Sequence, residues 1–186
     1  MKKKLSLVIY FSFLIIYLEL VYKLFVLNNV FSINSLTIIL FSIPFIMINT
    51  ILCSLFSEKV NRGISIILSL FLTFIFVSQY VYYLFYDSIF SVYSVKEGTG
   101  QVFGEFFNAI VKMVSDNVLS IILLLMPFIL FLIFGKKIFS FNKGKKSLVI
   151  ESISLLVFII VSLITVMFDD KGMYSLKNVY TKTHAP

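Results

Sequence analysis

The sequence predicts an all-α integral membrane protein with five transmembrane helices. Its 186 residues are 60% hydrophobic and 13% charged, and the mean hydropathy is +1.03. A soluble domain is nearer half apolar and about a quarter charged. The apolar residues form five long runs separated by polar connections, and a helix of about 20 apolar residues spans the hydrocarbon core of a bilayer.

The predicted transmembrane helices cover residues 5–27, 36–56, 64–85, 118–134 and 148–168. The first run is longer than the 7–15 apolar residues of a secretory signal and lacks an Ala-x-Ala cleavage site, so we expect it to be retained. The second run carries Pro44, which membrane helices tolerate when neighbours satisfy the freed carbonyl. A tight polar turn is expected at 57–63. Asp116 and Asn117 are predicted to cap the fourth helix.

The distribution of basic residues predicts the orientation. Ten of the 16 Lys and Arg residues fall at the N-terminus and in two short connections: Lys2, Lys3, Lys4, Lys59, Arg62, Lys136, Lys137, Lys143, Lys145 and Lys146. Short basic connections remain in the cytoplasm. The N-terminus is therefore expected inside, and five spans place the C-terminal tail, residues 169–186, outside.

The longest connection, residues 87–117, is predicted to be external and to contain an amphipathic helix over 101–115. Its apolar residues recur at i, i+3, i+4 and i+7, which is typical of one helical face. They are Phe103, Phe106, Phe107, Ile110, Val111 and Val114. Such a helix lies in the membrane interface with its apolar side down. It either packs as a lid on the helix ends or forms a surface that guides a lipid headgroup or docks a second domain.

Two further sets of residues are candidates for contacts at the outer side. Tyr82, Tyr83 and Tyr86 end the third predicted helix, and tyrosine gathers at membrane interfaces because its ring is apolar and its hydroxyl is polar. Glu19 and Lys23 lie four residues apart within the first helix, which favours an ion pair reaching toward the outer surface. An ionisable group within a span is a functional candidate, so a contact of Glu19 with another helix or a headgroup is the alternative.

No set of residues in the sequence matches the pattern of a catalytic, cofactor-binding or metal-binding site. Cys53 is the only cysteine, and His184 is the only histidine. Gly98, Thr99 and Gly100 do not make a phosphate-binding loop, because no strand precedes them and no Gly-Lys-Ser/Thr follows. We therefore expect no catalytic, cofactor-binding or metal-binding residue in this chain, and no nucleic-acid partner.

Several of these segments together resemble the membrane region of the lipoteichoic acid synthase family. The resemblance rests on residues 82–86 (YYLFY), 90–94 (FSVYS) and 98–101 (GTGQ), closed by the span that contains Pro127. It implies five spans with the N-terminus inside, in the plasma membrane of a bacterium with a Gram-positive-type envelope. In that family an extracellular sulfatase-like domain uses manganese and transfers glycerol phosphate from phosphatidylglycerol. No position here matches its catalytic residues, and the tail resembles the start of the linker to that domain.

Three functions therefore stay open on the sequence. The first is the membrane-anchoring module of such a phosphoglycerol transferase, catalytically incomplete in this chain. The second is a stand-alone scaffold that recruits a cell-envelope enzyme. The third, a small transporter, is less favoured because the five predicted spans show no internal repeat.

Overall fold

The computed structural model describes residues 4–26, 34–87, 105–142 and 144–168. Within these residues the chain is almost entirely helical, in agreement with the predicted class. The elements are β1 (Leu5–Ser6), α1 (Leu7–Val26), α2 (Asn34–Leu52), α3 (Glu58–Tyr86), α5 (Glu105–Asp116), α6 (Val118–Ile138), β2 (Phe139–Ser140) and α7 (Lys145–Phe168).

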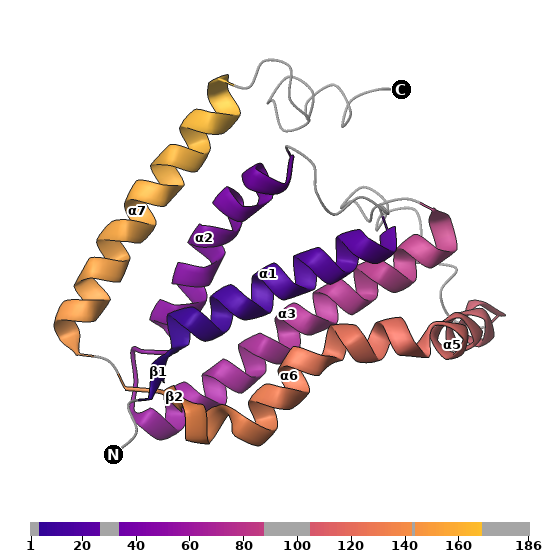
Figure 1. The fold of residues 1–186 in the computed structure, drawn as a ribbon, viewed down its shortest axis with the longest axis horizontal. Coiled ribbons are helices and arrows are strands. Elements are labelled where there is room, and N and C mark those ends of the chain that lie inside the picture. The colour runs from indigo at the N-terminus through magenta and orange to yellow at the C-terminus, as the bar shows by residue number, and fades with distance from the viewer. Residues whose placement is uncertain (1–3, 27–33, 88–104, 143, 169–186) are drawn as a thin grey trace.

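The long helices α1, α2, α3, α6 and α7 run back and forth, and each reverses the direction of the long helix before it (Figure 1). Helices α1, α3 and α6 lie side by side, α2 packs on α1, and α7 packs on α2. The buried core lies around α1, whose inward residues include Leu7, Phe11, Leu14 and Leu18. The short helix α5 runs across the ends of α3 and α6, and it is seen almost along its axis in Figure 1.

Four helices in the described part of the chain are long and apolar enough to cross a membrane. They contain the stretches Leu7–Val26, Glu58–Tyr86, Val118–Ile138 and Ser147–Thr165. Helix α2 contributes a shorter apolar stretch, Leu40–Leu52. Large apolar side chains point outward along these helices, for example Phe74 (64% exposed) and Leu119 (72% exposed). Such exposed apolar surface suits lipid contact and would be a liability in water.

The predicted turn at 57–63 is wrong, because α3 begins at Glu58 and α2 already ends at Leu52. The side chain of Asn61 holds the turn between the two helices. Its amide accepts a hydrogen bond from the Phe56 N–H at 2.9 Å and donates one to the Phe56 carbonyl at 2.8 Å. These bonds hold Phe56 in the turn, although the sequence pattern assigned it to the second span.

The other predicted boundaries shift by a few residues. Residues 5–6 form a strand, α6 continues four residues beyond the predicted end at 134, and α7 begins at Lys145 instead of 148. Two lysines in the last turn of α6 favour its extension, because cations stabilise the C-terminal end of a helix dipole. The predicted helix over 101–115 is observed as α5 from 105 to 116.

A two-stranded parallel sheet joins the start of α1 to the end of α6, with Leu5 opposite Phe139 and Ser6 opposite Ser140. The sheet lies at the end of the molecule where α3 begins and α6 ends (Figure 1). This end carries described basic residues from three segments, and we call it the basic end: Lys4, Lys59, Arg62, Lys136 and Lys137. The opposite end, where α5 crosses α3 and α6, is called the α5 end.

Candidate functional site

The most distinctive polar feature of the structure is a buried stripe along α3. Its four members recur at every fourth residue and are fully buried: Asn61, Ser65, Ser69 and Thr73. Because residues four apart lie on one helical face, the stripe faces the packed interior of the bundle. The apolar pattern of the sequence did not predict this stripe, although small polar residues at this spacing within an apolar span are a known signal of close helix packing.

Hydrogen bonds connect the stripe to the rest of the bundle. The Ser69 hydroxyl donates to the Ser65 carbonyl at 2.6 Å, and the Ser65 hydroxyl donates to the Asn61 carbonyl at 2.8 Å. Ser69 also accepts a bond from the Tyr10 hydroxyl of α1, and the Asn61 amide donates to the Phe141 carbonyl at 2.8 Å. The stripe therefore ties α3 to α1 and to the segment after β2.

Aromatic rings surround the Tyr10 contact. The Tyr10 ring stacks on Phe131 of α6 with centroids 3.9 Å apart and an interplanar angle of 15°. Phe139 and Phe141 also pack near Phe131, with centroid distances of 6.0 and 6.2 Å. Gly135 lies against the same ring, and a methyl group at this glycine would lie 2.9 Å from Phe131. The cluster fixes how closely α1, α3 and α6 approach.

The predicted pair Glu19 and Lys23 lies on α1, within the bundle. Lys23 is only 5% exposed, and Glu19 is half-buried. The two residues are four positions apart on α1 and so lie on neighbouring turns of the helix. Tyr22 precedes Lys23, and among the described residues its buried hydroxyl has no hydrogen-bond partner. The Tyr22 ring makes an edge contact with Phe76 of α3, with centroids 6.1 Å apart. Long basic side chains near a helix end often extend to the surface. Lys23 instead packs against protein.

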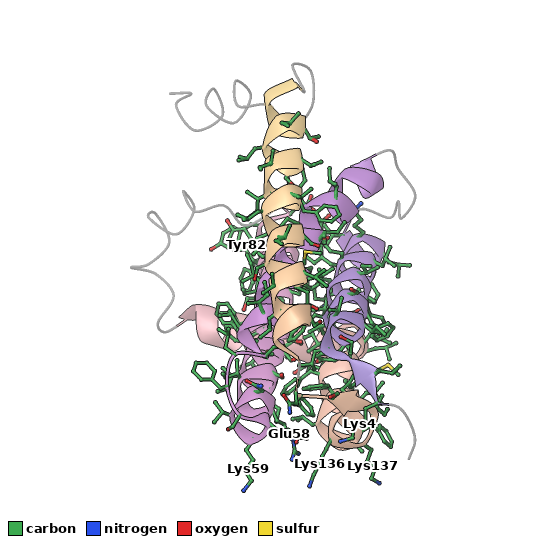
Figure 2. The ribbon with its side chains drawn as sticks, turned by 90° about the vertical axis from the view of Figure 1, so that its left-hand side faces the viewer. Lys4, Glu58, Lys59, Tyr82, Lys136 and Lys137 are labelled. Atoms are coloured by element: carbon green, nitrogen blue, oxygen red, sulfur yellow. The ribbon has the colours of Figure 1, made fainter. Side chains whose placement is uncertain are left out.

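The predicted tyrosines gather near the end of α3. Tyr82 and Tyr86 contact each other with ring centroids 4.6 Å apart, and Tyr86 is 54% exposed. Tyr83 is half-buried and packs against the core. Figure 2 shows Tyr82 far from the lysines of the basic end. Asp87 closes the helix in a left-handed conformation with φ 46°.

The predicted apolar face of α5 is described only in part. Phe103 lies outside the described residues, and so do the side chains of Phe106 and Phe107. Ile110 is half-buried, and Val114 packs against the core. The C-terminal part of α5 therefore rests on the bundle with an apolar residue inward.

Asn117 begins α6 as predicted, but its side chain makes no capping hydrogen bond. It donates to the Met113 carbonyl of α5 at 3.0 Å and accepts from the Tyr80 hydroxyl at 3.3 Å. Its role is thus to join α5 to α3 at the α5 end.

Comparison with known proteins finds no matching family model, no matching curated protein and no matching solved structure. The candidate site must therefore be judged on its geometry. Among the described residues, no three His, Cys, Asp or Glu side chains gather as ligands for a metal ion. What the described geometry does provide is a tightly packed bundle with two chemically different ends.

Proposed function

We propose that this chain is the membrane module of a phosphoglycerol transferase of the lipoteichoic acid synthase type, in the plasma membrane of a bacterium. The observation that carries the proposal is the charge difference between the two ends of the alternating bundle. All five residues of the basic end lie where α3 and α7 begin and α6 ends, which suits a cytoplasmic surface. In this proposal α2 is the fifth span, and the α5 end faces outward.

The outward end supports a role in positioning an enzyme. Helix α7 ends on the side away from the basic end, and α5 lies across α3 and α6 (Figure 1). A sulfatase-like catalytic domain with its own manganese, joined after α7 or recruited as a separate chain, meets this surface. The module then holds that domain at the outer leaflet, where phosphatidylglycerol is its lipid substrate. If the domain is a separate chain, the protein is a scaffold.

A fusion experiment tests the proposal. The catalytic domain of a lipoteichoic acid synthase is fused after Pro186 and expressed in a strain that lacks the native synthase. The matched control is the same domain on a single unrelated transmembrane helix of the same orientation. We expect this chain to restore more glycerol phosphate polymer than the control. Equal or lower polymer would contradict a specific module.

A second arm separates the anchor from the scaffold. The catalytic domain, carrying only the single-helix anchor, is expressed together with this chain as a separate protein. More polymer than from the anchored domain alone supports recruitment in trans, whereas a gain only in the fusion supports the anchoring module.

A further inference from the structure

The basic end assembles cations from three segments that are remote in the sequence. Lys4 precedes β1, Lys59 and Arg62 lie in the first turns of α3, and Lys136 and Lys137 lie in the last turn of α6. In Figure 2 the labelled lysines lie at the same end of the bundle, and Glu58 is the acidic residue among them. Glu151 lies further along α7. The balance at this surface is strongly positive.

Specific contacts hold these segments together. Pairing of Leu5 with Phe139 places Lys4 beside the end of α6. The buried Asn61 amide bonds the Phe141 carbonyl, so the first turns of α3 are fixed against the segment after β2. The backbone segments that carry these cations are therefore held at one end of the bundle, and their combined positive potential attracts an anion.

Exposed apolar side chains lie next to these cations. Phe56 (59% exposed) and Val60 (48%) flank the Lys59 segment, Leu5 (45%) follows Lys4, and Ile138 (41%) follows Lys137. A soluble anion or an acidic peptide satisfies only the charges. A lipid satisfies both, because its phosphate meets the lysines while its acyl chains cover the apolar side chains.

We propose that the basic end binds anionic phospholipid headgroups, with Lys59, Lys136 and Lys137 as the principal phosphate contacts. The recognition is of phosphate charge at the end of an acyl-chain lipid, and it acts in the leaflet opposite to the proposed enzymatic surface. Lipid bound there stabilises the junction of β1, α3 and β2.

Spin-labelled lipids test the proposal on the full chain in phosphatidylcholine bilayers. Electron paramagnetic resonance gives the association of labelled phosphatidylserine and phosphatidylglycerol relative to phosphatidylcholine. One phosphate contact changes association about five-fold. We expect a preference of at least that size for both anionic lipids, and a ratio near one after combined Lys59→Gln, Lys136→Gln and Lys137→Gln substitution. These lysines are exposed, so the variant is expected to fold, and circular dichroism verifies its helicity.

The matched control is Lys112→Gln, because Lys112 is exposed on α5 at the other end of the molecule. It should leave the preference unchanged. An unchanged preference in the triple variant, or an equal loss in the Lys112 variant, would overturn the proposal. Displacement of the labelled lipid by soluble glycerol phosphate at equal concentration would also overturn it. Phosphatidylserine has no glycerol headgroup to transfer. A preference for phosphatidylserine therefore tests lipid binding at the basic end independently of the proposed phosphoglycerol transfer.

Discussion

The hydroxyl of Tyr10 donates a 2.9 Å hydrogen bond to Oγ of Ser69, although the two residues are 59 positions apart. The same Tyr10 ring stacks on Phe131. One side chain of α1 thus makes a polar contact to α3 and an apolar contact to α6. Removing the Tyr10 hydroxyl alone, or the whole ring, separates the contributions of these two contacts to the free energy of unfolding.

Tyr10→Phe removes only the hydrogen bond. We expect it to lower the free energy of unfolding by about 0.6 kcal/mol, the average for hydrogen bonds between membrane helices. Tyr10→Ala also removes the ring and is expected to cost about 3–5 kcal/mol. Unfolding in mixed micelles with increasing sodium dodecyl sulfate measures both. Ser69→Ala also removes the bond to the Ser65 carbonyl, so it should cost less in the Tyr10→Phe background than alone. Fully additive losses would show that Tyr10 and Ser69 do not interact.

Gly135→Ala is expected to destabilise the bundle by about 1–3 kcal/mol. Its added methyl group meets the Phe131 ring at 2.9 Å, and that ring is held by its stack on Tyr10. The matched control is Gly63→Ala in α3, where the added methyl group has no described atom within 4 Å apart from its chain neighbours and the backbone of its own helix. Since alanine favours helix over glycine by about 1 kcal/mol, the control should be neutral or stabilising. The same unfolding assay measures both variants. Equal changes in the free energy of unfolding at the two glycines would contradict close packing of Gly135 against Phe131.

Asn61→Ala should disrupt the basic end. It removes part-buried bonds to the Phe56 N–H and carbonyl and the buried bond to the Phe141 carbonyl. The Phe141 carbonyl, left buried without this partner, costs about 1–3 kcal/mol. We expect lower stability and faster hydrogen exchange at Phe56.

Asn49→Ala is the matched control for Asn61→Ala. Asn49 is also buried, but its amide donates to the Phe45 carbonyl of its own helix. Asn49→Ala should lower the free energy of unfolding by less than half as much as Asn61→Ala does. A similar loss in the two variants would mean that Asn61 does not bridge the segments.

The orientation of the bundle can be measured by single-cysteine labelling. Ser57 at the basic end and Ser115 on α5 are both exposed and therefore accessible to a thiol reagent when replaced by cysteine. With Cys53→Ala as background, an impermeant thiol reagent applied to intact cells should label Ser115→Cys and not Ser57→Cys. Labelling of both positions after permeabilisation is the control. Labelling of Ser57→Cys alone in intact cells would reverse the proposed topology.

The sequence by itself determined the class of protein and the approximate positions of its helices. Runs of about 20 apolar residues must form helices in a bilayer, because backbone groups find no water there. The amphipathic period likewise predicted a helix in the long connection, and α5 is observed within it. The charge asymmetry predicted an orientation before any contact was known.

Only the tertiary structure decided which polar residues face the interior and where the helices end. Asn61 was assigned to a polar turn by composition, yet its amide lies fully buried and bridges Phe56 and Phe141. Ser69 is one of several serines in the predicted spans, and only its contact with Tyr10 distinguishes it. Hydropathy describes the transfer of a side chain into lipid. It does not specify which neighbouring helix supplies a partner, because that depends on packing between residues far apart in the chain.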